Sequence, residues 1–570
     1  MVSSEETEQS PRPPLEKRSQ HPYVSHGLTA GFFLVVAAVL AVNAWLTFMG
    51  GGFRAELAQE TDEPAHYVTA LMVRDYVAQG IPTTPLEFAK NYYLHYPKVA
   101  LGHWPPFFYV LQAAWLLIFG VSRTAILSLV LLITALLAAS LCMVVRHACG
   151  PVVAGAVTAL FLGIPLVQAY SGMVMVDMLI ALISFWAILV WARYMEAPTW
   201  PLAIGFAFLS IAAIMTKGNG FALALAPPIA IVLCRRWDLL KQRSLHGLIL
   251  LIALICLPWH FVTRGFMLPT MQYEFSLEYF ASASWYFLSH LLRAPGAVVD
   301  LFALAGVVAK VISPYRLGRV EPLWGAALAQ IVAVQVFCST VPAGMEPRYL
   351  LASLPMLLMF AAAGVLWVSK RLNGLGLPAR GWVVVNAGLI LAVLFATVFE
   401  IPKKYRFGFE EVAVQLTSTV ELRNSVVLCS SDANGEGALI SEIAMREARP
   451  GHVILRASKM LADMDWNGRN YKLKMETPEQ IRQFLESTPI EIVVLDRTPG
   501  HRLEHEDLLE ASITSPGWER IGVYPTAPDS FTWRQARVEV WRQQGVSQRP
   551  APHFSVDMRP TPKITVFPGH

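Results

Sequence analysis

Long apolar runs alternate with short polar segments over most of the chain, from about residue 27 to residue 400. Runs of about twenty apolar residues can cross the hydrocarbon core of a bilayer as helices. The pattern predicts a first span at Gly27–Met49. Further predicted spans are Ala125–Val145, Val152–Ala169, Met178–Tyr194, Leu202–Met215, Phe221–Cys234, Gly247–Val262, Ala294–Val311, Leu323–Val341, Leu350–Val368 and Gly381–Phe399.

The distribution of lysine and arginine sets the predicted topology. Loops rich in these cations stay in the cytoplasm. The cation groups fall in alternate loops only if Pro105–Gly120 enters from the outer face and does not complete a crossing. About eleven crossings result, with the N-terminal tail inside and the C-terminal region outside. The cation groups are Arg146, Arg193, Arg235/Arg236 with Lys241/Arg243, Arg316/Arg319, and Lys370/Arg371 with Arg380.

The polar stretch 50–104 becomes the first outer loop on this topology. Pro64 suits the first turn of a helix and Gly80 suits its end, so a helix is expected over Pro64–Gln79. Its apolar stripe beside charged residues is typical of a helix lying in the membrane interface. Asp62 and Glu63 precede this helix, close to the positive end of its dipole.

The composition changes from about residue 405, where short apolar runs alternate with helical stretches. This predicts a small α/β domain over residues 405–545. The predicted strands are Val426–Cys429, Val453–Leu455, Ile490–Leu495, Ile521–Tyr524 and Val538–Trp541, with helices at Glu436–Arg446 and Pro478–Leu485. Ser430–Gly437 could cradle a phosphate, but it lacks Walker spacing and its lysine, which favours an ordinary strand–helix turn. Residues 546–570 are rich in proline and are expected to be loose.

Composition indicates a membrane protein and argues against a nucleic-acid-binding protein and a structural zinc protein. The chain is 55% hydrophobic and only 15% charged, whereas soluble domains carry about a quarter charged residues. A net charge of +4 without a long basic run argues against nucleic-acid binding. The six cysteines form no CxxC or CxxH group, which argues against a structural zinc site. Residues 1–26 are interpreted as a disordered cytoplasmic tail, and the first span as an uncleaved anchor.

The suggestive polar residues all face outward on the predicted topology, which a purely structural account does not require. They are the Asp62 loop, the Ser171–Asp177 loop, Lys217, the Arg264–Arg293 loop and Glu346–Tyr349. Carboxylates at a membrane rim are scarce, so this grouping predicts a catalytic cavity opening at the outer leaflet.

The motifs in this order resemble the GT-C superfamily of polytopic glycosyltransferases. They are Asp62-Glu63 after the first span, His103-Trp104-Pro105-Pro106, Met173–Val176 leading into Asp177, and Thr216-Lys217-Gly218. Over roughly residues 27–370 the chain is similar to the bacterial lipid A aminoarabinose transferases and the protein O-mannosyltransferase-like group. Residues 27–400 would then form the catalytic module. These relatives commonly have Glu or Lys before the first-loop proline, where this chain has His103-Trp104, so the acceptor and any metal requirement stay open.

The resemblance implies a polyprenyl-phosphate-linked sugar donor and an acceptor (lipid A, another glycan or a protein) at the outer face of the cytoplasmic membrane. It implies Asp62 as the catalytic carboxylate and Asp177 as the second acidic position. Lys217 and Arg348-Tyr349 would lie near the donor phosphate, and Glu63 and His103 are further substrate-binding candidates. The chemistry agrees, because a sugar phosphate has a good leaving group and needs a base and cations. A glycosidase would want two carboxylates flanking the bond.

Each candidate also has a structural alternative. Asp62, Glu63 and Asp177 could cap helices. Lys217 could extend to the interface from a helix end, and Arg348 could pair locally with Glu346. His66, His103 and Glu278 could bind a divalent metal together with Glu63, although such histidines are more often interface residues. The rival function is a transporter or flippase of a lipid-linked sugar, which would be expected to show a repeated half and ionisable groups at the midplane.

Overall fold

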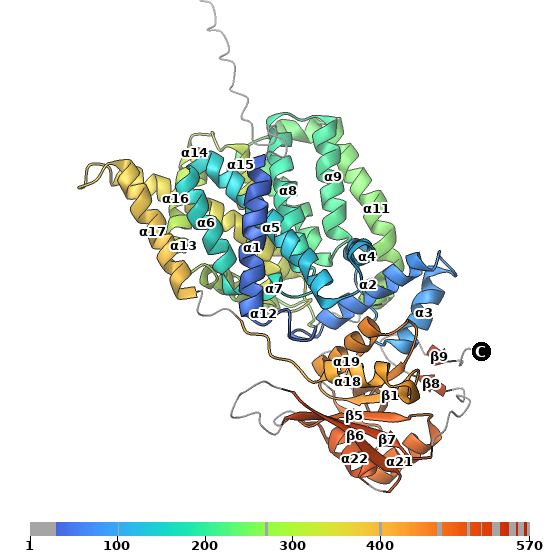
Figure 1. Cartoon of the computed structure of the whole chain (residues 1–570). Coiled ribbons are helices and arrows are strands. Elements are labelled where there is room, and N and C mark those ends of the chain that lie inside the picture. Colours follow the sequence, from blue (N-terminus) through green and yellow to red (C-terminus); the bar gives the residue numbers. More distant parts are fainter. Residues whose placement is uncertain are drawn as a thin grey trace, which may run out of the picture.

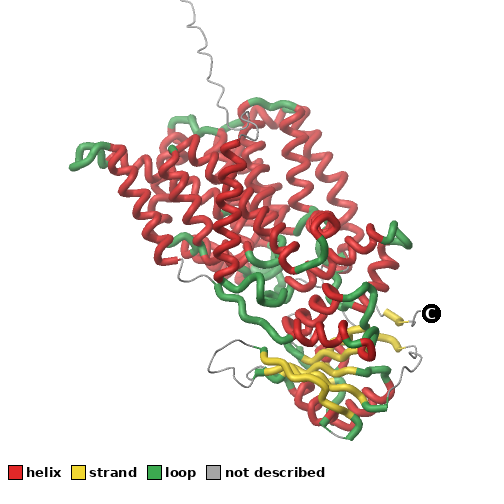
Figure 2. Tube along the Cα trace, viewed as in Figure 1, coloured by secondary structure: helices red, strands yellow, loops and turns green. Residues whose placement is uncertain are grey.

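The structure is a computed structural model of a helical bundle with a smaller sheet-containing part below it (Figures 1 and 2). It describes residues 30–100, 102–267, 272–397, 402–463, 470–498, 502–514, 516–526, 536–545, 554–556 and 564–566. The predicted tail 1–26 lies outside the described residues, as does most of the Pro-rich segment 546–570. Within that segment β8 (Phe554–Val556) pairs with β9 (Ile564–Val566), a hairpin that the proline content had argued against.

The bundle is formed by helices, most of them apolar, together with short 3-10 segments and one π-helical segment, η4. They are α1 (Ala30–Met49), α2 (Glu63–Ala78), α3 (Pro85–His95), α4 (Phe107–Phe119), α5 (Arg123–Cys149), α6 (Pro151–Gly163), α7 (Pro165–Ser171), α8 (Asp177–Glu196), α9 (Trp200–Ile214), η1 (Gly218–Phe221), α10 (Ala222–Cys234), η2 (Trp237–Lys241), α11 (Arg243–Met267), α12 (Leu277–Arg293), α13 (Ala297–Val307), η4 (Val308–Ile312), α14 (Ser313–Arg316), α15 (Pro322–Thr340), η5 (Pro347–Ala352), α16 (Leu354–Arg371) and α17 (Ala379–Thr397).

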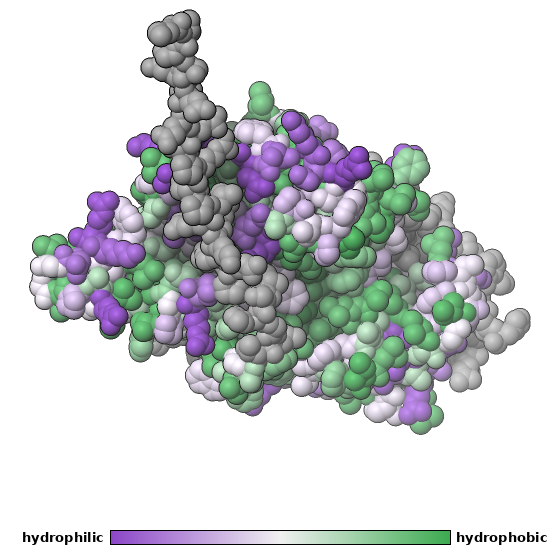
Figure 3. Space-filling model, turned by 90° about the horizontal axis from the view of Figure 1, so that it is seen from above, coloured by the Kyte–Doolittle hydropathy of each residue, from purple (hydrophilic) through white to green (hydrophobic). Residues whose placement is uncertain are grey.

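Many of these helices have membrane dimensions. In the described part of the chain seven are long and apolar enough to cross a bilayer, and α6 with α7 forms a further candidate bent by 65°. Shorter apolar helices occur at α4, α9, α10 and α17. Seen from the end opposite the sheet, hydrophilic side chains gather in separate patches, and hydrophobic ones cover wide areas beside them (Figure 3). The chain is a multi-pass membrane protein, and the count of about eleven crossings stays a prediction.

Helix α4 begins and ends at the same end of the bundle. The Phe107 amide donates to the Met215 carbonyl at the end of α9. Arg123, four residues after α4, forms ion pairs with Glu410 and Glu442 of the C-terminal part. Both ends of α4 therefore lie on the side of the C-terminal sheet, and the segment does not cross the bundle.

The segment Arg264–Arg293, which the sequence analysis treats as a loop, is largely helical. Helix α11 continues to Met267, and α12 occupies Leu277–Arg293. Tyr279, Ala283, Phe287 and Leu291 repeat at every fourth residue and are buried on one face of α12. Serines within the helix and charged residues near its two ends lower the mean hydropathy, so a search for uniformly apolar runs misses this helix.

The C-terminal α/β domain contains a five-stranded mixed sheet in the order β2-β1-β5-β7-β6. Strands β2, β1 and β5 are parallel, whereas β7 pairs antiparallel with both β5 and β6. Its elements are α18 (Phe409–Ser418), η7 (Val420–Leu422), β1 (Val426–Ser430), α19 (Ala433–Arg446), β2 (Val453–Arg456), α20 (Ala457–Met460), β3 (Ala462–Asp463), β4 (Lys472–Leu473), α21 (Pro478–Ser487), β5 (Ile492–Asp496), α22 (Glu504–Ile513), β6 (Trp518–Pro525) and β7 (Arg537–Gln543). All five residues of β1 and of β5 are buried, as expected of central strands.

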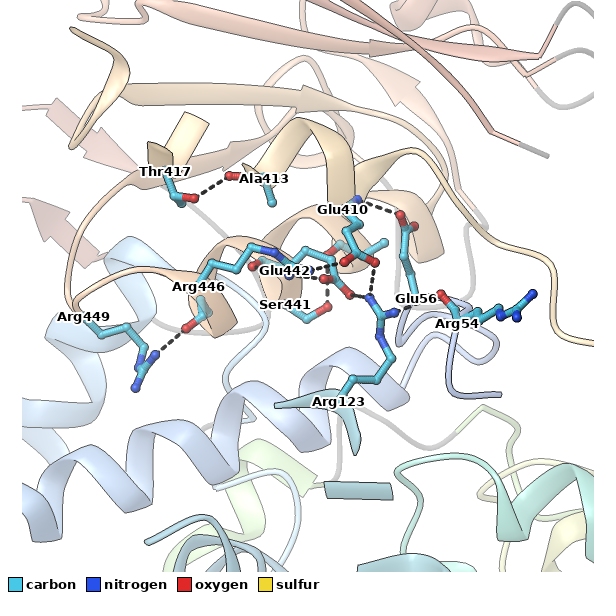
Figure 4. A network of polar contacts seen from close by, with 12 residues as sticks. Arg54, Glu56, Arg123, Glu410, Ala413, Thr417, Ser441, Glu442, Arg446 and Arg449 are labelled. Atoms are coloured by element: carbon cyan, nitrogen blue, oxygen red, sulfur yellow. Dashed lines mark hydrogen bonds and ion pairs between the residues drawn. The ribbon is translucent and has the colours of Figure 1, made fainter. Parts of the chain in front are cut away.

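A buried ionic network joins this domain to the bundle (Figure 4). The Arg123 guanidinium donates to Glu410 at 2.9 Å, to Glu442 at 2.8 Å and to the Arg54 carbonyl at 2.9 Å. Arg446 contacts the same two glutamates. Nearby, helix α19 approaches α2 so closely that a Cβ at Gly437 would lie 2.7 Å from Pro64 Cγ. The domain thus holds the loop 50–104 in place next to Asp62.

Candidate functional site

Asp62 immediately precedes helix α2, in the N-cap position. Its side chain makes no capping hydrogen bond to that helix. The carboxylate instead accepts a hydrogen bond from Arg348 Nη2 on η5, with a distance of 3.0 Å between Nη2 and Oδ2. Both side chains are buried in this contact. The structure therefore selects the ion pair over the capping alternative, and Arg348 pairs with Asp62 instead of Glu346.

The surrounding charges keep Asp62 ionised. Burial raises the pKa of Asp62, but the positive charges of Arg348 and Lys217 outweigh it and bring the pKa below its usual value. Burial lowers the pKa of neighbouring His66 to about 3, so this imidazole is neutral at physiological pH. The cations around Asp62 are therefore lysine and arginine side chains.

Asp177 and Lys217 form a second ion pair beside the first. Lys217 Nζ lies 3.4 Å from Asp177 Oδ1, and both side chains are buried. The same ammonium lies 4.9 Å from the centre of the Tyr349 ring, and the Arg348 guanidinium lies 5.8 Å from it. Tyr349 thus lies against both cations, and Lys217 points inward and not to the interface.

This double pair is incompletely satisfied. Arg348 Nε and Nη1, and Asp177 Oδ2, are buried without a hydrogen-bond partner among the described residues. Buried polar groups of folded proteins are nearly always hydrogen-bonded, and exceptions call for an explanation. Free guanidinium donors in a buried site suit an anion with several oxygens, such as a phosphate.

The remaining predicted residues surround this centre in different ways. Glu63 accepts from the backbone amides of Gln59 and Val174, both at 3.0 Å, so its oxygens tie the first outer loop to the turn before α8. Burial raises the pKa of Glu63. His103 packs edge-on against Trp104, with ring centres 5.1 Å apart.

The three metal candidates do not come together. His66 is fully buried, and its Nδ1 lies 2.9 Å from the Tyr109 hydroxyl. Glu278 is exposed at the start of α12. No group of three His, Cys, Asp or Glu side chains with metal-binding geometry occurs among the described residues. A divalent-ion requirement stays a prediction.

Sequence reasoning missed several side chains near the site. Lys98 donates to the Thr61 carbonyl at 3.3 Å, next to Asp62. Lys404 contacts the Gly172 carbonyl. Gln330 and Asn219 line a pocket with Asp177, Arg348 and Tyr349. Of these residues, Gln330 could have been identified from the sequence, because a glutamine within an otherwise apolar span is unusual.

Comparisons with known proteins give matches to solved structures only. No protein-family model and no curated protein sequence matches the chain. The chain is similar to ArnT from Cupriavidus metallidurans bound to undecaprenyl phosphate, with 16% identity, 91% of this chain and 99% of that chain covered, and a TM-score of 0.56. The apo form of that ArnT gives a TM-score of 0.54, again with 16% identity, over 90% of this chain and 98% of that chain.

A second similar structure comes from an archaeon. The oligosaccharyltransferase AglB from Archaeoglobus fulgidus, in complex with an inhibitory peptide and a dolichol-phosphate, is 11% identical, with 81% of this chain and 69% of that chain covered and a TM-score of 0.50. At such identities the likeness concerns the arrangement of the helices and of the domain behind them. The chain therefore has a GT-C-like fold, as its sequence motifs predicted.

Proposed function

We propose that this protein is a membrane glycosyltransferase that moves a sugar from a polyprenyl-phosphate donor to a hydroxyl or amine acceptor. One observation carries the proposal. Asp62, Arg348, Asp177 and Lys217 form one buried cluster in which two guanidinium donors lack an acceptor. The similar structures support it, because ArnT was solved with undecaprenyl phosphate and AglB with dolichol-phosphate.

In the proposed reaction the acceptor oxygen or nitrogen attacks the anomeric carbon. The bond between that carbon and the phosphate oxygen breaks, and the lipid phosphate leaves with the electron pair. Asp62 takes the acceptor's proton, while Arg348 and Lys217 stabilise the charge on the phosphate. Attack opposite the leaving group inverts the anomeric centre. Asp177 orients Lys217 and a polar group of the donor or acceptor.

Donor binding would also activate Asp62. In the structure the Arg348 guanidinium is hydrogen-bonded to Asp62. Its positive charge lowers the pKa of this carboxylate and so keeps it a weak base. A phosphate that accepts from one of the free Arg348 donors shares the positive charge of Arg348. The pKa of Asp62 then rises toward the range in which it accepts a proton. The strength of Asp62 as a base thus depends on whether the donor occupies its site.

The proposed location is the cytoplasmic membrane, with the site and the C-terminal domain outside. The last turns of α14 and α16 carry Arg316, Lys370 and Arg371. Both helices end at the side of the bundle opposite the sheet (Figure 1). Cation-rich ends face the cytoplasm, so the cluster around Asp62 would face away from it.

The test is transfer of radiolabelled sugar from a polyprenyl-phosphate donor in membranes that contain the protein, with and without EDTA. We expect labelled acceptor to form, and the Asp62→Asn variant to form none. Movement of intact donor across vesicles without product would instead support a flippase. Undiminished transfer by the Asp62→Asn variant would remove the base assignment.

A further inference from the structure

A narrow pocket extends from the ionic cluster into the bundle, between α8 and α15. On α8 its lining contains Asp177, Ile180 and Ser184, which lie on one helical face. On α15 it contains Cys338, Val334 and Gln330 at successive turns. Asp177 and Ser184 are separated by about 10 Å along the helix axis. The pocket therefore has a charged mouth at Asp177 and Arg348, and its lining becomes uncharged further inside.

Gln330 is the unexplained residue of this pocket. Its side chain is 0% exposed, and neither its Oε1 nor its Nε2 has a hydrogen-bond partner among the described residues. Burying a primary amide without partners is costly, so such a group persists where a ligand or water completes it. Asn219, from η1, lines the same pocket and brings a second amide.

We propose that Gln330 and Asn219 form a subsite for one hydroxyl-bearing substituent of the donor's sugar, with the lipid phosphate at the Arg348 mouth. This inference rests on the proposed function. An amide offers a donor and an acceptor, which is the pair that a hydroxyl group needs. The space is sufficient for a group of about the size of a water molecule, so it suits a hydroxyl or hydroxymethyl group and not a whole ring.

The subsite would make the enzyme selective among sugars. A buried amide that pairs with a substrate hydroxyl is left unpaired when an analogue lacks that hydroxyl, and such sites discriminate strongly. An ordered water in the same place would satisfy Gln330 equally well, but it would give no preference for a glycosylated lipid. The two occupants therefore differ in a measurable quantity.

The experiment compares binding of undecaprenyl phosphate with binding of its pentosyl and hexosyl esters to the purified full-length protein in nanodiscs. The wild type should bind at least one glycosylated lipid about tenfold or more tightly than the bare lipid. The Gln330→Met variant keeps the side-chain shape. It should reduce this preference to about threefold or less and leave affinity for the bare lipid unchanged.

The matched control is Gln335→Met, on the same helix. Gln335 Nε2 donates to the Ser284 carbonyl at 2.9 Å, and the residue does not line the pocket. This variant should keep the wild-type preference, and thermal unfolding of both variants checks their fold. Full preference in the Gln330→Met variant overturns the subsite and leaves a structural water there.

Two further outcomes separate the subsite from the proposed function. If the wild type binds bare and glycosylated lipids equally, the subsite is wrong and the phosphate site stands. If the wild type binds neither lipid and transfers no sugar, the proposed function fails, and the subsite fails with it.

Discussion

Two buried ionic networks in this protein differ in how completely they are paired. At the domain interface Arg123 uses both terminal nitrogens, on Glu410, Glu442 and the Arg54 carbonyl, and its Nε alone has no partner among the described residues. In the candidate site Arg348 uses one nitrogen, on Asp62, and its Nε and Nη1 have no partner among the described residues. Both arginines are buried and face carboxylates, so charge and burial alone do not distinguish the two networks.

The difference indicates different roles. A network most of whose donors meet acceptors within the chain fixes two parts of the molecule together. A network with several spare buried donors and a spare carboxylate oxygen has a desolvation cost that a ligand or an ordered water can offset. Perturbed, incompletely paired groups are therefore better functional candidates than equally buried, well-paired ones. The variants below test this distinction in order of expected effect.

Asp62→Asn should have the largest effect on activity. The asparagine side chain cannot accept the acceptor's proton, and transfer should fall by a factor of about 10³ or more. The measurement is the rate of radiolabelled sugar transfer at a saturating donor concentration. Folding should persist, because the amide oxygen can still accept from Arg348.

The matched control for this variant is Glu60→Gln, in the same loop. Glu60 accepts from the Tyr170 hydroxyl at 3.1 Å, and among the described residues it forms no hydrogen bond or ion pair with Arg348 or Lys217. This variant should retain transfer within about threefold. Equal losses in the two variants would mean that any disturbance of the loop abolishes transfer, and would count against a specific role for Asp62.

Glu442→Ala should cause the largest loss of stability. The Glu442 carboxylate is fully buried between Arg123 and Arg446. Removing it leaves buried positive charge uncompensated, at a cost of about 3–5 kcal/mol. The thermal unfolding midpoint of the purified protein should therefore fall. The fraction that stays folded should still bind undecaprenyl phosphate, and a loss of lipid affinity without destabilisation would contradict the structural role.

Arg348→Lys should reduce kcat/KM by about 10- to 100-fold, a smaller effect than that of Asp62→Asn. Lysine keeps the positive charge but loses the planar set of donors that can share a phosphate with Asp62. The matched substitution at the interface is Arg123→Lys, which should lower the unfolding midpoint and leave kcat/KM nearly unchanged. If both variants lower kcat/KM, or both lower only the unfolding midpoint, the two networks do not differ in role.

The sequence predicted the ionic cluster better than its surroundings. Asp62, Lys217 and Arg348 were identifiable because charged residues beside apolar spans stand out. Their partners were not, since the contact between Asp62 and Arg348 joins segments 286 residues apart. The interface glutamates Glu410 and Glu442 could not be distinguished from solvent-exposed charges of a soluble domain. Gln330 is uncharged, and only coordinates show that its amide lacks a partner.

The same limit applies to secondary structure. Uniformly apolar spans such as α5 and α16 were predicted closely, because composition alone decides them. Helix α12 was missed, since its burial depends on one face packing against the bundle. Sequence patterns thus identify groups that are unusual in their own segment, whereas pairing between distant segments requires the fold.

The last prediction concerns pH and the interface network. Glu56 is buried there and accepts from the Glu410 amide at 2.7 Å. Burial and the nearby Glu442 charge raise its pKa from 4.5 to about 8. Between these values the folded protein binds a proton that the unfolded chain has lost. Glu56 therefore contributes stability that is full below pH 4.5 and is lost as pH rises through about 8.

Glu56→Gln removes this titration and keeps a side-chain oxygen for the Glu410 amide. Relative to wild type, the variant should gain on the order of 5 kcal/mol at pH 9 and lose most of this advantage as pH falls to 5. Thermal unfolding of both proteins between pH 5 and 9 measures the difference. A constant offset across this range would show that Glu56 does not titrate in the interface. In that case the burial of Glu56, and not a change in its charge, would account for its effect on stability.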